Sequence, residues 1–303
     1  MSMSRGGSAT EGDGARTVLG NGSLRVEVSA PGAELVSLRR VGSQVEYLWQ
    51  GDPAHWGRRA PWLFPIVGAL RGGVYTYQGC EYRLPQHGFA RDRRFALVAS
   101  EAARAVYELR DDEASRACFP FHFCLRVTYR LIGDVLAVDL GVDNPGPGEL
   151  LFSVGGHPGF NWPLTVEEGR EGFLVELAHA ENAERWPVVE GLIADRPEPF
   201  LCGERVVELA PGLFERGALV FKSIRSRCAR YMRRDRSHGV ELVFDDFPYF
   251  ALWSKPGAPF VCLEPWSGIA DSVSASGRLE DKEGILRLEP GESLQRRLAI
   301  KPW

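Results

Sequence analysis

The segment with the clearest capacity for chemistry is V-C-L-E-P-W-S-G-I-A-D-S at 261–272. Glu264 ends a short apolar run, and Pro265 restricts the residue before it to an extended conformation, so the carboxyl group is held in a fixed direction. Trp266 adds a flat apolar face, and Gly268 allows backbone to come close to a ligand. A fixed carboxylate beside an aromatic face suits acid–base chemistry on a small molecule, although a packed strand end gives the same pattern.

Two histidines in short loops are the natural partners of this carboxylate. His157 lies in F-S-V-G-G-H-P-G-F-N at 152–161, where glycines leave room for a ligand and a proline restricts the backbone. His87 lies in L-P-Q-H-G-F-A-R-D at 84–92, with Arg91 close enough to share its surroundings. An imidazole titrates near neutral pH, so either side chain can act as an acid, a base or a hydrogen-bond donor. The alternative for both is a histidine of a surface turn.

The composition and the motifs exclude several other classes of protein. A formal net charge of −4 and a pI near 5.9 argue against a dedicated nucleic-acid binder. No apolar run approaches the ~20 residues of a membrane-spanning helix. Metal-ligand spacings of histidine, a G-x-S-x-G nucleophile elbow and a G-x-G-x-x-G dinucleotide loop are absent from the sequence. We therefore expect a protein that acts on a small molecule and has no metal, nucleic-acid or membrane partner.

The side chains described above are carried by predicted strands and the loops between them. Residues 121–131 and 136–142 alternate between apolar and polar side chains on either side of Gly133-Asp134, which predicts an antiparallel pair with one buried face. Two prolines make 60–67 irregular, and only 270–285 has room for a helical turn or two. Further strands are predicted at 24–28, 45–49, 74–77, 81–84, 173–177, 219–221, 240–244, 249–253 and 294–300. The expected fold class is all-β, with antiparallel sheets.

The organisation of the chain is simple. No composition break or repeat divides it, so we expect a single β domain over residues 17–303. Residues 1–16 are rich in glycine and serine and lack an apolar core, which predicts a disordered N-terminal tail and not a secretory signal. The six cysteines are scattered without a C-x-x-C pair. A chain of this length needs no disulfides, so we expect free thiols and a cytoplasmic location.

Together, these segments resemble motifs of the aldose 1-epimerase (galactose mutarotase-like) family. The likeness is strongest to the branch found beside lactose-utilisation genes, and it runs from about Thr17 to the C-terminus. Five motifs agree in order: F-P-I-V-G at 64–68, Q-H-G-F-A-R-D at 86–92, G-G-H-P-G-F-N at 155–161, L-E-P-W-S-G-I-A-D-S at 263–272 and L-E-P-G-E at 288–292.

The resemblance implies a β-supersandwich, in which antiparallel sheets carry a sugar cleft on one face. It also implies cofactor-independent interconversion of the α and β anomers of a free aldose. By position, Glu264 matches the general base of the family and His157 its general acid, while His87 matches a histidine that holds the sugar near the ring oxygen. Arg71 lies near the sugar-binding arginine of the family, although the local spacing is loose.

Arg91 and Trp266 complete the expected sugar-binding set, and Phe160 offers a further apolar face.

The chain departs from the family pattern in one place. Many members have an aspartate that binds sugar hydroxyls, expected here near L-F-E-R-G-A-L-V-F at 213–221, where this chain has Gly217. Glu215, Asp245 and Asp246 are the acids available to replace it.

Two other functions remain open. A related branch acts on hexose 6-phosphates, and Arg91 with Arg71 would then clamp the phosphate. The same sandwich also occurs as a non-catalytic carbohydrate-binding module, which would tolerate the loss of Glu264 or His157. Because both of these residues are present, the module ranks third.

The catalytic roles constrain protonation. Glu264 must be ionised and His157 protonated, and their ordinary pKa values are about 4.3 and about 6.5. We expect the negative charge of Glu264 to favour the imidazolium of His157, and we expect a bell-shaped dependence of rate on pH.

Overall fold

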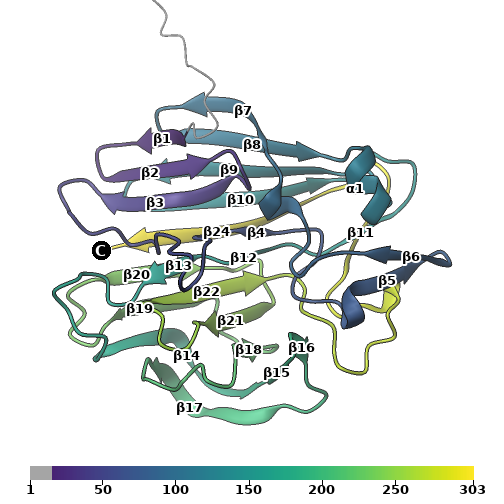
Figure 1. Cartoon of the computed structure of the whole chain (residues 1–303). Coiled ribbons are helices and arrows are strands. Elements are labelled where there is room, and N and C mark those ends of the chain that lie inside the picture. Colours follow the sequence, from purple (N-terminus) through teal and green to yellow (C-terminus); the bar gives the residue numbers. More distant parts are fainter. Residues whose placement is uncertain (1–15) are drawn as a thin grey trace, which may run out of the picture.

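The computed structural model describes residues 16–303, which form an almost entirely β structure of antiparallel sheets (Figure 1). This confirms the expected fold class. The predicted tail lies outside the described residues except for Arg16, with which the first strand begins. Among the described residues there is one α-helix, α1 (Glu113–Cys118), and no helix is long and apolar enough to cross a membrane.

The largest sheet has nine strands in the order β17-β14-β19-β20-β24-β10-β9-β8-β7, and all neighbours are antiparallel. The last strand of the chain, β24, therefore lies between β20 and β10, as its yellow ribbon shows in Figure 1. The bounds are β7 (Ala96–Glu101), β8 (Arg104–Arg110), β9 (Cys124–Ile132), β10 (Val135–Asp143), β14 (Phe173–Arg185), β17 (Glu198–Glu208), β19 (Cys228–Arg233), β20 (Gly239–Val243) and β24 (Ser293–Pro302).

Two smaller sheets complete the main layers. One has six strands, namely β18 (Leu219–Phe221), β21 (Tyr249–Trp253), β22 (Phe260–Trp266), β12 (Gly155–Gly156) and β4 (Trp62–Leu63) in that order, with β13 (Gly159–Asn161) also paired to β22. The other comprises β1 (Arg16–Gly20), β2 (Leu24–Ser29) and β3 (Glu34–Arg40).

The remaining elements are short. The two-stranded pairs are β5 (Val74–Tyr77) with β6 (Cys80–Arg83), β11 (Leu150–Phe152) with β23 (Leu286–Leu288), and β15 (Val188–Val189) with β16 (Leu192–Ile193). Three 3₁₀ turns are η1 (Arg71–Gly73), η2 (Ala90–Asp92) and η3 (Leu279–Asp281).

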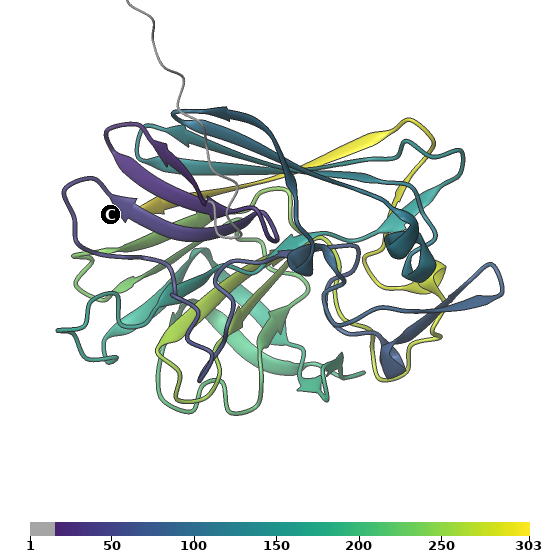
Figure 2. The same ribbon diagram turned by 45° about the horizontal axis from the view of Figure 1, so that its top comes forward.

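The main core lies between the nine-stranded sheet and the two smaller sheets. Val127 and Tyr129 of β9 share one buried cluster with Val26 of β2 and Leu263 of β22. In Figure 2 the blue-to-teal strands β7–β10 and the yellow β24 form one layer, and the purple three-stranded sheet lies against it. All seven residues of β22 are buried. This strand is therefore a fixed support for any side chain that it carries.

The long hairpins are predicted better than the irregular segments. The β9–β10 and β5–β6 pairs are confirmed, although β9 begins at Cys124 and not at Phe121. The predicted strand 45–49 is wrong, since only the bridge between Leu48 and Phe160 forms there. The Glu46 carboxylate accepts hydrogen bonds from the backbone N–H groups of Leu38 and Leu48, at 2.9 and 3.1 Å, in place of a strand ladder.

The helical prediction is confirmed only in part. Within 270–285 there is only the single turn η3, whereas the six-residue helix α1 was not predicted. That helix is too short to show an apolar period. It begins with a reciprocal cap in which Asp112 accepts from the Ser115 N–H at 2.7 Å and the Ser115 hydroxyl accepts from the Asp112 N–H at 2.8 Å.

Candidate active site

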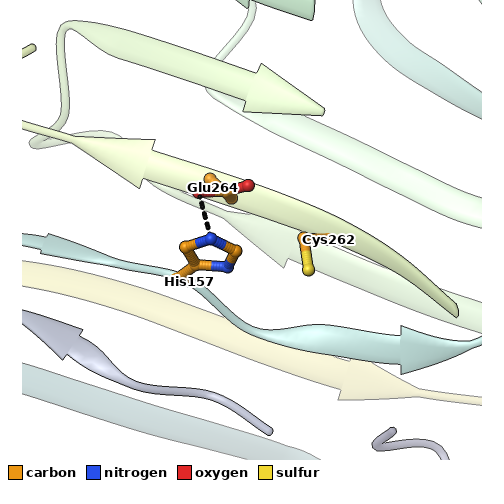
Figure 3. A group of neighbouring side chains, drawn as sticks. All are labelled: His157, Cys262 and Glu264. Carbon is orange, nitrogen blue, oxygen red and sulfur yellow. Dashed lines mark ion pairs between the residues drawn. The ribbon is translucent and has the colours of Figure 1, made fainter. Parts of the chain in front are cut away.

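His157 and Glu264 are cross-strand neighbours. Gly155 pairs with Trp266 and Gly159 pairs with Cys262, and the same register places His157 opposite Glu264. Residues opposite one another in an antiparallel pair project from the same face. Nε2 of His157 lies 3.1 Å from Oε2 of Glu264, and both side chains are buried (Figure 3). The carboxylate and the imidazole singled out in the sequence therefore meet.

Backbone contacts hold this pair in place. The His157 N–H donates to the Pro61 carbonyl, and the Leu263 N–H donates to the Pro158 carbonyl, both at 3.1 Å. The flanking glycines serve this close packing. A Cβ atom at Gly155 would lie 2.7 Å from the Trp266 ring, so the expectation that this glycine leaves room for a ligand is wrong.

Two tryptophans enclose the imidazole of His157. Trp56 stacks on it with ring centroids 4.9 Å apart and an interplanar angle of 29°, and Trp253 meets it edge-on at 5.6 Å. Neither residue was predicted as part of the site. Trp56 lies in a loop without alternation or motif, and Trp253 resembles any other apolar residue of a strand. The sequence carried no specific signal for either.

His87 lies beside the pair in a tight turn. Its backbone φ is +66° and that of Gly88 is +69°, where a Cβ would clash at 2.3 Å with the Phe64 carbonyl oxygen. The His87 N–H donates to the Gly68 carbonyl at 2.8 Å, and the Gly68 N–H donates to Nδ1 of His87 at 3.1 Å. These hydrogen bonds assign the proton of the neutral ring to Nε2.

The environment of His87 reinforces this neutral form. Burial lowers the pKa of His87 well below its ordinary value, and the neighbouring His157 acts in the same direction. The two imidazole centroids lie 5.6 Å apart. His87 is therefore placed to donate a hydrogen bond from Nε2 and not to carry charge.

These side chains line a cavity of about 370 Å³, within the range of small-molecule sites. Its polar lining comprises Gln86, His87, Arg91, His157 and Glu264. Three tryptophans also line it: Trp56, Trp253 and Trp266. Much of the remaining wall is apolar and comes from the β15–β16 hairpin and the segment that enters β18, with Val188, Ile193, Ala218 and Val220.

Trp266 and Arg91 both line the cavity. Nε1 of Trp266 is buried without a hydrogen-bond partner among the described residues, and the side chain lines the cavity. One Nη atom of Arg91 donates to the Gln86 carbonyl at 2.6 Å. Burial lowers the pKa of Arg91 to about 10, and the charge of Arg58 adds to this effect, so the guanidinium remains charged at neutral pH.

The prediction for Arg71 is wrong in its geometry. Its guanidinium donates to the Ala275 carbonyl at 2.6 Å and does not line the cavity. The backbone N–H of Arg71 instead donates to Oδ2 of Asp271 at 3.0 Å. Asp271 also forms a buried ion pair with Lys282, whose Nζ lies 2.9 Å from Oδ1. This pair supports the segment that presents Ala270 to the cavity.

The acid missing at Gly217 is not replaced. Gly217 lines the cavity, but Glu215, Asp245 and Asp246 do not, and Asp246 accepts a hydrogen bond from the Arg297 N–H at 2.8 Å. Within residues 16–303, Glu264 is the only carboxyl group in the cavity wall. The predicted apolar contact of Phe160 is also wrong, because this residue is fully buried in the main core.

Burial dominates the protonation of the pair. It raises the pKa of Glu264 well above its ordinary value and lowers the pKa of His157 to about 3. Both directions are opposite to those expected, because a buried site favours the neutral carboxyl and the neutral imidazole. The neutral pair and the ion pair hold the same single proton. Its transfer across the 3.1 Å contact converts one form into the other.

A thiol lies beside the pair. Cys262 is two residues before Glu264 on β22, so the two side chains project from the same face of the strand. Ligand atoms of His157, Cys262 and Glu264 all lie within 4.8 Å of one another (Figure 3). The spacing rules for metal ligands missed this group because His157 is distant in sequence from Cys262 and Glu264 and meets them only through pairing with β22. All six cysteines of the chain are free thiols, as expected.

Comparison with known proteins agrees with this architecture. The family model described as aldose 1-epimerase matches residues 16–301. Protein LacX of Lactococcus lactis subsp. lactis, in a plasmid-encoded form, is 31% identical over 282 residues, which cover 90% of this chain and 94% of that protein.

Solved structures show the same likeness. A galactose mutarotase related enzyme from Lactobacillus acidophilus has a TM-score of 0.90 at 33% identity, with 95% of this chain and 97% of that chain covered. A galactose mutarotase-like protein from Lactobacillus casei has a TM-score of 0.87 at 26% identity, covering 95% of this chain and 100% of the other.

Proposed function

Because this chain belongs to the aldose 1-epimerase family, we propose that it interconverts the α and β anomers of a free aldohexose by acid–base ring opening. The observation that carries this proposal is the 3.1 Å contact between Nε2 of His157 and Oε2 of Glu264 in the cavity wall. The anomeric hydroxyl oxygen and the ring oxygen of a pyranose are bonded to the same carbon. A base and an acid that act on them together must therefore lie side by side, as these two groups do.

In the proposed reaction, the Glu264 carboxylate accepts the proton of the anomeric hydroxyl while His157 donates a proton to the ring oxygen. The bond between the anomeric carbon and the ring oxygen breaks, leaving an open-chain aldehyde. Rotation about the bond between C1 and C2 presents the other face of the aldehyde. The ring then closes as each proton returns to the group that gave it, and the two residues recover their starting states. Each positioned acid or base contributes typically ~10²–10⁴-fold to the rate.

The remaining polar groups are suited to hold the sugar. His87 offers an Nε2–H donor, Arg91 a positive charge and Trp266 an indole N–H without a partner among the described residues. Trp56 and Trp253 present aromatic surface to the same cavity. Aromatic faces pack against the C–H surface of a pyranose, so the cavity combines the two kinds of contact that a sugar needs.

A free sugar fits the charge of the cavity better than a phosphorylated one. The phosphate clamp requires Arg71 together with Arg91, and only Arg91 lines the cavity. We therefore expect faster turnover of glucose or galactose than of glucose 6-phosphate. A higher kcat/KM for the phosphorylated sugar would reverse this choice.

Polarimetry of freshly dissolved α-D-glucose and α-D-galactose tests the function. The wild-type chain should accelerate the change in rotation, and Glu264→Gln should lower the rate towards the spontaneous value. Glu215→Gln is the matched control, since that glutamate does not line the cavity and its variant should keep the wild-type rate. Equal rates for wild type and Glu264→Gln, both above the spontaneous rate, would remove Glu264 from the mechanism. No acceleration by the wild-type chain on either sugar would favour the non-catalytic binding module.

A further inference from the structure

We propose that His157, Cys262 and Glu264 form a binding site for one thiophilic divalent cation of the Zn²⁺ type. Occupancy of this site would block the sugar reaction, and that consequence rests on the proposed function. The site itself does not depend on it. The argument uses the geometry of three side chains, the chemistry of their donor atoms and the charge balance of a buried group.

The geometry is close to that of a three-ligand centre. Tetrahedral zinc with bonds of about 2.0–2.3 Å places neighbouring nitrogen, oxygen and sulfur ligands about 3.3–3.5 Å apart. Nε2 of His157 and Oε2 of Glu264 are already 3.1 Å apart, and all three donors lie within 4.8 Å of one another. The Cys262 sulfur is the third donor of the set. Figure 3 shows the thiol beside the imidazole, on the strand that carries the carboxyl group.

The donor set selects the class of cation. Nitrogen, sulfur and carboxylate oxygen together suit zinc and similar borderline ions, whereas magnesium and calcium prefer oxygen alone. His157 and Glu264 both line the cavity, so a cation entering from the cavity reaches them first. Three protein ligands leave a fourth position for water or a sugar oxygen on that side.

Charge balance favours a divalent ion at this place. The pair of His157 and Glu264 holds one proton, and the buried thiol of Cys262 holds another. Binding of the cation releases both protons, leaving a carboxylate, a thiolate and a neutral imidazole around two positive charges. The resulting group has no net charge, which burial requires. The cation then occupies the place of the proton that ring opening uses.

The surroundings point to a reversible site and not to a resident metal. A metal-bound histidine usually donates its other ring N–H to a carboxylate or a carbonyl, which strengthens the site. Nδ1 of His157 is buried without such a partner among the described residues. Cys262 also packs with the aromatic cluster of Trp49 and Phe260. We therefore expect an inhibitory cation that a chelator removes.

Cobalt titration tests the site without reference to activity. The full chain is treated with a chelator, freed of it, and titrated with Co²⁺ alone. One equivalent should produce a thiolate-to-cobalt charge-transfer band in the near ultraviolet, and Zn²⁺ should displace it. Cys262→Ser should lose the band. Cys202→Ser is the matched control, because Cys202 is exposed and distant from the cavity lining, and it should keep the band.

Inhibition by Zn²⁺ supplies the second measurement. For each protein, inhibition is measured relative to its own metal-free rate. The Zn²⁺ concentration for half-inhibition of Cys262→Ser should be at least about tenfold higher than that of the wild type. Cys262→Ala repeats the test if the serine variant unfolds at a lower temperature. The cobalt band still decides the proposal if the wild-type chain has no epimerase activity. A band that survives in Cys262→Ser, a band absent from the wild type, or equal Zn²⁺ inhibition of wild type and Cys262→Ser would overturn it.

Discussion

The indole of Trp56 lies on the imidazole of His157, with ring centroids 4.9 Å apart and planes inclined by 29°. Aromatic contacts of this kind contribute about 0.5–1.5 kcal/mol beyond the area that they bury. The stack restrains the ring whose Nε2 faces Glu264. Trp56 is thus a positioning residue for His157 as well as part of the cavity wall.

Removing this stack should slow the reaction. We expect Trp56→Ala to lower kcat by roughly 3- to 10-fold, the range that corresponds to the contact energy, while Trp56→Phe keeps most of the rate. Polarimetric initial rates over a range of sugar concentrations separate kcat from KM. Trp303→Phe serves as a control, since Trp303 does not line the cavity. A change confined to KM would assign Trp56 to sugar contact alone.

The dependence of rate on pH should show the shared proton of the pair. The proposed reaction requires that His157 and Glu264 together hold one proton. At low pH the pair gains a second proton as His157 titrates, with a pKa of about 3. At high pH it loses its proton as Glu264 titrates, with a pKa well above its ordinary value of 4.5.

The acid limb of the profile is therefore decisive. With a chelator present, kcat/KM should stay constant as the pH falls from roughly 6.5 to roughly 4, whereas an exposed histidine would titrate within that interval. The profile remains bell-shaped, but its limbs lie further apart than the ordinary pKa values imply. A fall in kcat/KM centred near pH 6.5 would contradict the burial of His157.

Stability should reveal the buried carboxyl group of Glu264 independently of activity. Below the ordinary pKa of 4.5 the group is protonated in the folded and unfolded states alike, so folding neither binds nor releases a proton there. As the pH rises through the raised pKa of the folded state, the unfolded chain has already released its proton, and stability is lost. Glu264→Gln cannot lose a proton. Its free energy of unfolding relative to wild type should therefore increase with pH.

Urea unfolding at about pH 4, 6 and 8 measures this difference. Glu241→Gln is a suitable comparison, because Glu241 pairs with Arg230 at 2.6 Å and its side chain is partly exposed. A free-energy difference between Glu264→Gln and wild type that does not change with pH would show that Glu264 titrates normally in the folded chain.

The buried ion pair of Lys282 and Asp271 should be compatible with a stable fold only while both partners are present. Nζ of Lys282 donates to Asp271 at 2.9 Å and to the Ile269 carbonyl at 2.7 Å, and both charged side chains are buried. Lys282→Met leaves a carboxylate without its cation and should cost about 3–5 kcal/mol of unfolding free energy. Adding Asp271→Asn should recover part of that loss.

Lys301→Met provides the matched control for this prediction. Lys301 pairs with Asp134 at 2.9 Å, but both side chains are exposed, so its loss should cost only about 0–1 kcal/mol. Equal destabilisation by Lys282→Met and Lys301→Met, measured by urea unfolding, would show that burial of the first pair has no energetic consequence.

The sequence pattern contained enough information for the fold class, whereas the architecture and the centre of the site were expected from the family resemblance. Strict alternation identified the β9–β10 pair, and Pro265 identified the extended backbone at Glu264. The segment around His157 pairs with β22, and the family resemblance, not either local pattern, predicted that contact. These features depend on neighbours along the chain or on a single strand pairing.

The features that sequence reasoning missed depend on packing between distant segments. Trp56 joins the site only because its loop folds over His157, and Arg71 leaves it because its guanidinium finds the Ala275 carbonyl. The protonation of Glu264 was predicted in the wrong direction, since its pKa follows from burial by several elements. The spacing of residues along the chain predicts none of these effects.

Glu264 sits on a strand that is hydrogen-bonded along both edges, to β21 on one side and to β12 and β13 on the other. Much of the apolar wall comes instead from the short β15–β16 hairpin and the turn before β18. Substitutions in that hairpin can reshape what the cavity accepts without displacing the carboxyl group. Under the proposed function, a change in sugar preference therefore requires no displacement of the reacting carboxyl group.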